Sequence, residues 1–314
     1  MVASPMPEVS VVIPTRNRAH QLAECLGAVQ LQSLTNFAVH VMDQSDGEEA
    51  RQVVEDLADP RIEFVRVSRR GANPARNLGA ALAAAPLVAF LDDDCCPKPD
   101  WLANIVARFA SDRELQFVFG QLKAPPHDSR LGSVPEFLPE VSWQRKRGRR
   151  RVAMSAAGAN MSARKSFLLQ IGGFDELLGP SVPDISDCSI SLKVLRSGAQ
   201  WAAEPGIEVI HTNGFREYTQ LASIYQSYGR ELGLTYGRFL RRSDPYALWC
   251  FVAEQTEMAA ACTNALIRTG RPRGARTMVA HAKGFLRGVM IRGDLGHVTG
   301  AQIRDMAVSR ELLP

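Results

Sequence analysis

Short apolar stretches alternate with longer amphipathic stretches over the first hundred residues of the chain. Strands are predicted at residues 9–14, 37–43, 62–67 and 87–90. Helices are predicted at residues 18–32, 49–58 and 73–85. Strands that alternate with helices favour a mostly parallel sheet flanked by helices, which is an α/β fold. Residues 103–210 mix short strands with Gly- and Pro-rich connections, and the chain from about 216 onward has the pattern of a helical extension.

Composition narrows the class of protein only slightly. The 314 residues carry a net charge of +4, which is too small an excess to indicate a nucleic-acid partner. The six cysteines form no CxxC pair and no secretory signal precedes them, so we expect free thiols in the cytoplasm. No apolar stretch reaches the roughly 20 residues that a membrane-spanning helix needs.

Polar side chains follow three of the predicted strands: Thr15-Arg16-Asn17, Asp43-Gln44-Ser45 and Asp92-Asp93-Asp94. Because parallel sheets bind ligands beyond the carboxyl ends of their strands, we expect these groups at one edge. A run of three aspartates is usually a solvated turn or a helix cap. After a buried strand, however, the carboxylates repel one another unless a cation joins them. Hard oxygen ligands suit Mg²⁺ or Mn²⁺, with a nucleoside diphosphate as the third partner.

Four segments in order carry a resemblance to a known family. They are VSVVIPTRNRAHQLAECLGAVQLQS, VMDQSD, GANPARNLGAALAAAPLVAFLDDDCCPKP and GANMSARKSFLLQIGGFDE. Together they resemble the inverting nucleotide-sugar glycosyltransferases of family 2, over roughly residues 8 to 213. The resemblance implies a GT-A fold with a Rossmann-like sheet. It also implies transfer from a UDP-sugar, or alternatively a dTDP-sugar, with Mn²⁺ or Mg²⁺ as cofactor.

The resemblance also implies residue roles for the donor and the metal. The nucleotide and donor sugar are assigned to Pro14, Thr15, Asn17, Asp43, Arg76, Asn77, Asp93 and Asn160. Arg76 and Asn77 lie in the motif whose helix start is near the diphosphate, and the alternative for Arg76 is an ordinary surface cation. Asp94 is assigned to the metal, and His211 at the end of a strand is either a metal ligand or structural. The family's second acid after Asp43 is Gln44 here, which puts the ribose or base contacts in doubt.

The catalytic base that the resemblance implies is Asp187, with Asp184 in reserve. Inversion needs one base near the acceptor hydroxyl. The family's preceding Glu is Ser186 here, and its later acid is Ser189. The alternative for Asp187 is a plain cap of the helix that follows it.

Two basic segments are candidates for contact with an acceptor or another partner. Residues 145–151 hold six cations beside Trp143. They are either a solvated run, a contact for an anionic or lipid-linked acceptor, or a contact for the donor's own phosphates. We assign Trp143, Arg149, Arg150 and Arg151 to that contact. The basic amphipathic helix around 275–292 would rest on an anionic membrane at the inner face of the cell, pack on the catalytic domain, or form a homodimer.

These inferences predict a nucleotide-sugar-binding half at residues 1–100, an acceptor-binding half at 101–215 and a helical region at 216–314. Because the QxxRW signature of processive synthases is missing, we expect addition of a single sugar. Cell-surface glycan or secondary-metabolite biosynthesis would be the setting. Two alternatives remain: a sugar-phosphate nucleotidyltransferase, and a non-catalytic protein that binds a nucleotide sugar.

Overall fold

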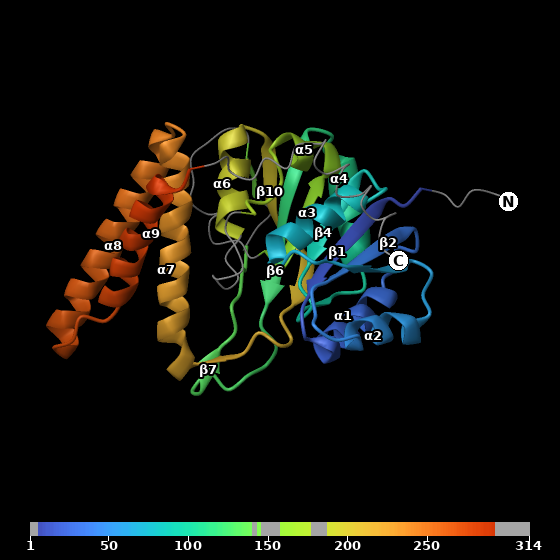
Figure 1. Ribbon diagram of the computed structural model, residues 1–314, viewed down its shortest axis with the longest axis horizontal. Coiled ribbons are helices and arrows are strands. Elements are labelled where there is room, and N and C mark those ends of the chain that lie inside the picture. Colours follow the sequence, from blue (N-terminus) through green and yellow to red (C-terminus); the bar gives the residue numbers. More distant parts are fainter. Residues whose placement is uncertain (1–5, 140–142, 146–157, 177–186, 293–314) are drawn as a thin grey trace.

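The computed structural model describes residues 6–139, 143–145, 158–176 and 187–292, with only the backbone of 143–145 (Figure 1). The strands in this part of the chain are β1 (Val9–Thr15), β2 (Phe37–Asp43), β3 (Ile62–Arg66), β4 (Leu87–Leu91), β5 (Cys96–Pro97), β6 (Leu115–Lys123), β7 (Gly132–Ser133), β8 (Trp143–Arg145), β9 (Asn160–Arg164), β10 (Gln200–Ile210) and β11 (Arg216–Glu217). The helices are α1 (Ala19–Gln30), α2 (Glu49–Leu57), α3 (Ala72–Leu82), α4 (Trp101–Ser111), α5 (Lys165–Gln170), α6 (Asp187–Ser197), α7 (Tyr218–Arg241), α8 (Pro245–Thr269) and α9 (Ala275–Met290).

The main sheet has the strand order β3-β2-β1-β4-β9-β6-β10-β5, and β8 pairs with β10. The first four strands are parallel, as the alternating sequence pattern predicts. β9 runs antiparallel between β4 and β6, and β10 is parallel to β6. The predicted α/β fold with a mostly parallel sheet is therefore confirmed. A single sheet joins segments from both sides of residue 100.

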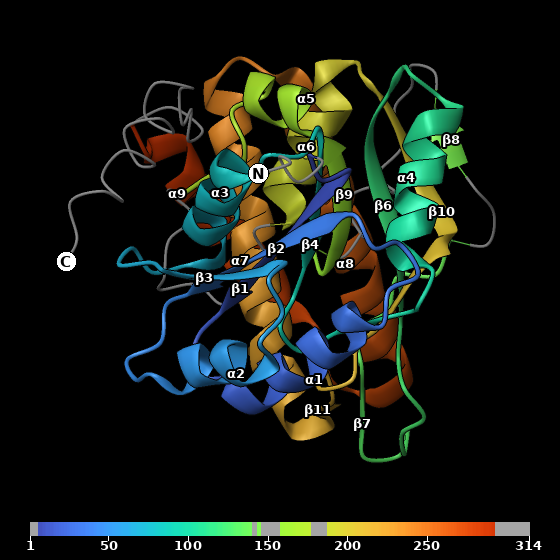
Figure 2. The ribbon, with the colours of Figure 1, turned by 90° about the vertical axis from the view of Figure 1, so that its right-hand side faces the viewer.

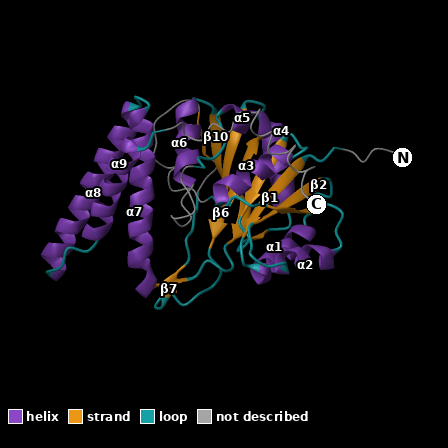
Figure 3. Cartoon of the chain, viewed as in Figure 1, coloured by secondary structure: helices purple, strands orange, loops and turns teal. Residues whose placement is uncertain are grey.

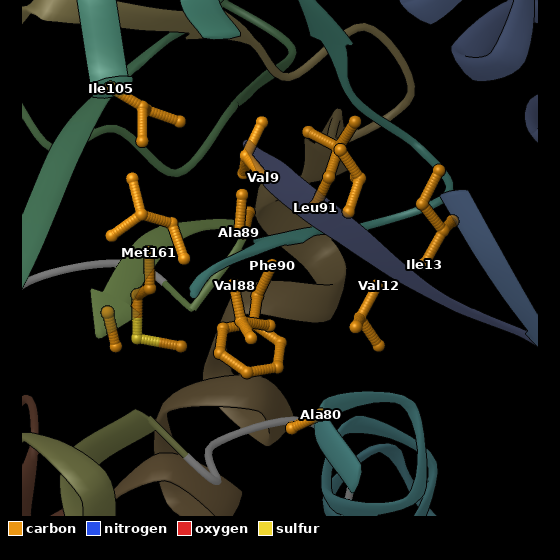
Figure 4. Packing of buried hydrophobic residues seen from close by; sticks show 14 of the residues in the cluster. Val9, Val12, Ile13, Ala80, Val88, Ala89, Phe90, Leu91, Ile105 and Met161 are labelled. Carbon is orange, nitrogen blue, oxygen red and sulfur yellow. The ribbon is translucent and has the colours of Figure 1, made fainter. Parts of the chain in front are cut away.

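Helices cover both faces of this sheet, with α3 on one side and α4 on the other (Figure 2). The side chains of neighbouring strand residues alternate between these faces, since the side-chain period of a strand is two. Val88 and Phe90 point toward Ala80 of α3, and Leu91 points to the opposite side, where Ile105 of α4 lies (Figure 4). The helix α3 packs against β1 and β2, whose carboxyl ends lead into the candidate site, and α4 packs against β10.

The helices α7, α8 and α9 stand together at one end of the molecule, beside α6 (Figure 3). They have a buried apolar cluster of their own, which includes Leu192 of α6, Tyr236, Cys250 and Phe285. The predicted C-terminal helical extension is confirmed. All six cysteines are free thiols, as predicted. None of the helices in the described ranges is long and apolar enough to cross a membrane.

Candidate active site

The ends of β1, β2 and β4 bring the first predicted residues together. The Thr15 hydroxyl donates to Asp93 Oδ2 at 2.7 Å, across 78 residues of sequence. Thr15 is also the register partner of Asp43, and the Gln44 N–H donates to the Thr15 carbonyl at 2.9 Å. The shared sheet edge predicted for these groups is therefore present in the fold.

Asp43 lies fully buried at the end of β2, where a carboxylate needs partners. Its Oδ2 lies 2.7 Å from the Arg66 guanidinium, and its Oδ1 accepts from the Ser45 hydroxyl at 2.5 Å. The same Ser45 oxygen accepts the N–H of Asn17, whose φ of 55° turns the chain after Pro14. Asp43 and the loop after β1 are thus connected through the Ser45 hydroxyl. The sequence reasoning missed Arg66, although this arginine ends a neighbouring strand.

Gln44 takes the place of the acid expected after Asp43. Its amide nitrogen donates to the carbonyls of Arg69 and Gly71 at 2.5 and 3.0 Å, and its amide oxygen accepts from the Gly71 N–H. A carboxylate cannot donate hydrogen bonds to carbonyl oxygens. Gln44 therefore holds the loop before α3 through hydrogen bonds, and it places no charge at this edge of the sheet.

The acidic run after β4 is held together by Arg18. One Arg18 nitrogen lies 3.1 Å from Asp93 Oδ1 and 3.2 Å from Asp94 Oδ2. Burial raises the pKa of Asp93 to about 6, although Arg18 and the Thr15 hydroxyl act in the opposite direction. Arg18 follows the strand end in TRNR, so its position at this edge was readable from the sequence, but we assigned it no role.

His211, directly after β10, contacts Asp94 of the same acidic run. Its Nε2 lies 3.6 Å from Asp94 Oδ1, and its Nδ1 lies 3.3 Å from the Pro135 carbonyl oxygen. Burial raises the pKa of Asp94 and lowers that of His211. The contact between the two outweighs burial, so the pKa of Asp94 lies below its usual value and that of His211 above. The carboxylate and imidazole face each other, as in a metal site.

The donor set suits a hard cation. Asp94, Cys95 and His211 each offer an atom, and the three atoms lie within 4.8 Å of one another. Burial raises the pKa of the Cys95 thiol well above its usual value, so the sulfur stays protonated and is a poor ligand. The carboxylate and the imidazole fit Mn²⁺ or Mg²⁺, and the Nδ1 contact with Pro135 would hold the ring in the required orientation.

Arg76 joins the acidic run to the predicted base. Its guanidinium is buried, 2.6 Å from Asp92 Oδ1 and 3.5 Å from Asp187 Oδ1. Asp187 Oδ2 accepts the N–H of Gly158 at 2.7 Å. The structure thus excludes the surface-cation alternative for Arg76. The predicted contact of Arg76 with the diphosphate stays a prediction. Gly158 was not singled out from the sequence.

Two further predicted donor residues point into the protein. The Asn77 amide donates to the Phe174 carbonyl and to Glu176, and accepts the N–H of Phe174 at 2.8 Å. Asn160 accepts from the Trp101 indole at 2.9 Å and donates to the carbonyls of Gln121 and Ile207 at 2.8 Å. Both amides have protein partners on each side, so their donor contacts stay predictions.

The remaining predicted site residues lie outside the described residues or side chains. These are the reserve base Asp184 and the acceptor contacts Trp143, Arg149, Arg150 and Arg151.

Comparison with known proteins agrees with this geometry. Residues 10–170 match the family described as glycosyl transferase family 2. The validoxylamine A glucosyltransferase of Streptomyces hygroscopicus subsp. jinggangensis is 36% identical over 151 residues, 45% of this chain and 36% of that protein. The GalNAc(5)-diNAcBac-PP-undecaprenol beta-1,3-glucosyltransferase of Campylobacter jejuni is 32% identical over 93 residues, 28% of this chain and 30% of that protein. The chain spans about a third of the length of each.

The fold has a solved counterpart. A mannosyltransferase from Pyrobaculum calidifontis, in complex with GDP-Man and Mn2+, superposes with a TM-score of 0.59 at 19% identity, covering 98% of this chain and 88% of that one. The sheet and the helices that flank it define an α/β protein of the GT-A type. The chain belongs to glycosyl transferase family 2, because the matched residues make up more than half of it.

Proposed function

We propose that this chain is an inverting glycosyltransferase that moves one sugar from a nucleoside-diphosphate sugar, a UDP-sugar, to an acceptor hydroxyl. The observation that carries the proposal is the arrangement at the carboxyl edge of the sheet. There the Asp94–His211 pair lies next to Asp93, and the Thr15 hydroxyl joins Asp93 to the strand ends that carry the buried Asp43. The Arg76–Asp92 ion pair reaches the Asp187 carboxylate.

The nucleotide would lie against the loop after β1. Pro14, Thr15 and Asn17 supply the backbone surface for the base, and Asp43 accepts its N–H. Arg66 would hold the Asp43 carboxylate in place for this role, because the two groups form an ion pair at 2.7 Å. Asp93 would bind the ribose, and the start of α3 would face the diphosphate.

Asp94 and His211 would hold Mn²⁺ or Mg²⁺. When bound, the ion supplies positive charge that stabilises the diphosphate as it departs. Thr15 and Arg18 keep Asp93 beside this pair of ligands.

Asp187 would act as the base. As the acceptor oxygen bonds to the anomeric carbon, the bond from that carbon to the diphosphate oxygen breaks, and the acceptor proton passes to Asp187. Arg76 and the Gly158 N–H fix the two oxygens of this carboxylate, which lies in the first turn of α6.

The acceptor would be anionic or lipid-linked, or a secondary metabolite. Two relatives support both: the name of one refers to an undecaprenol diphosphate glycan and that of the other to validoxylamine A. Trp143 and Arg149 to Arg151 would contact such an acceptor. Free thiols suit the reducing cytoplasm, which we propose as the location.

The test is a panel of nucleotide sugars with Mn²⁺ and the purified full chain, read by release of nucleoside diphosphate. We expect one donor to be turned over, with activity lost on chelation. Pyrophosphate release from a nucleoside triphosphate and a sugar phosphate would instead indicate a nucleotidyltransferase. Saturable binding of a nucleotide sugar with no turnover of any donor would indicate a non-catalytic protein.

Two variants separate the roles within the site. Asp94→Ala should lose metal-dependent UDP binding together with activity, while its unfolding midpoint stays near that of the wild type. Asp187→Asn keeps the shape but removes the basicity. We expect its turnover to fall by roughly 10²–10⁴ with donor affinity nearly unchanged. If Asp187→Asn kept its turnover, Asp184 would become the candidate base.

A further inference from the structure

Exposed large apolar side chains gather on the two outer helices of the C-terminal region. Within the described residues, eight of the fifteen such side chains lie between Leu248 and Met290. They are Leu248, Trp249, Val252, Leu266, Ile267, Val279, Leu286 and Met290. Scattered exposed apolar residues are ordinary, but a concentration of this kind marks a surface that another body covers.

One face of α8 carries no charge. The 25 residues of this helix include only three charged groups, Glu254, Glu257 and Arg268. At 3.6 residues per turn, nine of its exposed uncharged residues share an arc of about 120° that contains none of these charges. This α8 face consists of Leu248, Trp249, Val252, Thr256, Ala259, Ala260, Thr263, Leu266 and Ile267.

The exposed face of α9 continues this surface and adds cations. Phe251 of α8 stacks on Phe285 of α9 with ring centroids 3.8 Å apart, and Gln255 donates to the Met278 carbonyl. The α8 face begins next to Phe251 and Gln255 on the helical wheel, so it borders α9. The exposed α9 face consists of Arg276, Val279, Lys283, Leu286, Arg287 and Met290.

The charge of this part of the chain differs from that of the remainder. Residues 241–292 contain nine Lys and Arg against three Asp and Glu, a net charge of +6, whereas the whole chain carries only +4. Arg268, Arg271, Arg273 and Arg276 lie exposed around the α8–α9 connection. The apolar surface is therefore bordered by positive charge.

We propose that the α8 face and the α9 face together bind an anionic lipid surface. Apolar side chains on this surface would enter the boundary between head groups and acyl chains, with Trp249 at the level where aromatic rings gather. The arginines and Lys283 would meet the lipid phosphates, with their aliphatic stems lying along the apolar surface.

A second copy of the chain fits the surface less well than a membrane. A two-fold dimer places a patch against itself, so the cations of α9 and of the α8–α9 connection would meet their own equivalents. Like charges brought together in this way oppose association, whereas an anionic lipid surface attracts all of them at once.

The experiment is sedimentation of the full chain with vesicles of phosphatidylcholine, alone or mixed with phosphatidylglycerol. We expect binding to the mixed vesicles at low salt, weaker binding at high salt, and a blue shift of Trp249 fluorescence that Trp249→Phe removes. The triple variant Arg276→Gln, Lys283→Gln, Arg287→Gln should bind about fivefold more weakly per cation, or on the order of a hundredfold in all. Because no step reads sugar transfer, the result stands apart from that of the donor panel.

Apolar variants supply an independent arm with a matched control. Ile267→Ser removes a side chain that is 78% exposed, and we expect roughly tenfold weaker vesicle binding. Leu31→Ser, at 74% exposure beyond the end of α1, should bind as the wild type does. Absence of binding to the mixed vesicles, or binding that both the triple variant and Ile267→Ser retain, would overturn the proposal. The proposal would also be overturned if the chain formed a dimer in solution that Ile267→Ser dissociates and that added vesicles leave intact.

Discussion

At the scale of single residues, the position of the Asp187 carboxylate depends on a glycine. Gly158 donates its N–H to Asp187 Oδ2 at 2.7 Å, and a Cβ placed on Gly158 would lie 1.8 Å from Asp187 Oδ1. No side chain fits there without moving the carboxylate. Gly158 is thus a positioning residue for the proposed base.

We therefore expect Gly158→Ala to lower turnover by about a hundredfold, the effect of a displacement of about 1 Å in a catalytic group. The KM for the donor should change little, because Asp43 and the loop after β1 are untouched. Gly206→Ala is the matched control, since nothing lies within 4 Å of a Cβ at that position. Steady-state kinetics of both variants check this. Equal turnover of the two variants would contradict the role of Gly158.

At the scale of elements, α7 and α9 are held unusually close by glycines. Gly229, Gly233 and Gly237 recur every four residues on α7, so they share one face of the helix. A Cβ on Gly233 would lie 2.0 Å from the His281 carbonyl oxygen, and one on Gly284 would lie 1.9 Å from the Arg230 carbonyl oxygen. The two helix backbones are in direct contact along this line.

Gly233→Ala should therefore destabilise the fold by about 1–3 kcal/mol, as overpacking in a core does. Gly27→Ala in α1 makes the same chemical change where a Cβ meets nothing within 4 Å. Its expected effect is a gain of up to about 1 kcal/mol from helix propensity. Denaturant unfolding of both variants measures the difference. A neutral Gly233→Ala would mean that the helices can separate at little cost.

His281, at the centre of these helices, should make stability depend on pH. Burial lowers the pKa of His281 to about 4 from an ordinary value of 6.5. Between these values the unfolded chain binds the proton and the folded chain does not, so acidification favours unfolding. From pH 6.5 to 4 the wild type should lose up to about 3 kcal/mol more than His281→Phe.

Unfolding measured at several pH values checks this difference. His20→Phe is the control, because its side chain is 82% exposed, and its pH dependence should follow that of the wild type. Parallel curves for the wild type and His281→Phe would show that the buried ring does not titrate in this window.

At the scale of the whole molecule, one buried ion pair joins the helical region to the sheet domain. Arg238 of α7 donates to Asp175 at 2.8 Å, with side chains 2% and 0% exposed. Asp175 in turn accepts through its carbonyl from Asn73 of α3. The pair therefore connects α7 of the helical region to α3 of the sheet domain.

Removing one partner of a buried pair leaves the other charge uncompensated. Arg238→Met should cost about 3–5 kcal/mol and lower the unfolding midpoint of sheet and helices together. Arg130→Met breaks the Arg130–Asp128 pair, whose side chains are 87% and 37% exposed, and should cost at most about 1 kcal/mol. Calorimetry compares the two variants. Two separate transitions, with only one shifted by Arg238→Met, would show that the regions unfold independently.

The sequence by itself determined the order of strands and helices along the first hundred residues and the sheet edge at which the candidate site residues meet. The runs at 9–14, 37–43 and 87–90 predicted strands that the structure has at Val9–Thr15, Phe37–Asp43 and Leu87–Leu91. Side-chain periodicity is local, and the carboxyl ends of parallel strands share an edge whatever the remainder of the chain does. Thr15, Asp43 and the acidic run could therefore be placed together without coordinates.

Only the tertiary structure decided which partner each polar side chain takes. Asn77 and Asn160 belong to segments that resemble the family, yet their amides bond to Phe174 and Trp101 inside the protein. Arg76 reaches Asp187 across 111 residues, and the glycine that positions this carboxylate lies 29 residues before it. Such contacts depend on where distant segments pack, and nothing in the local pattern of a strand or helix encodes that distance.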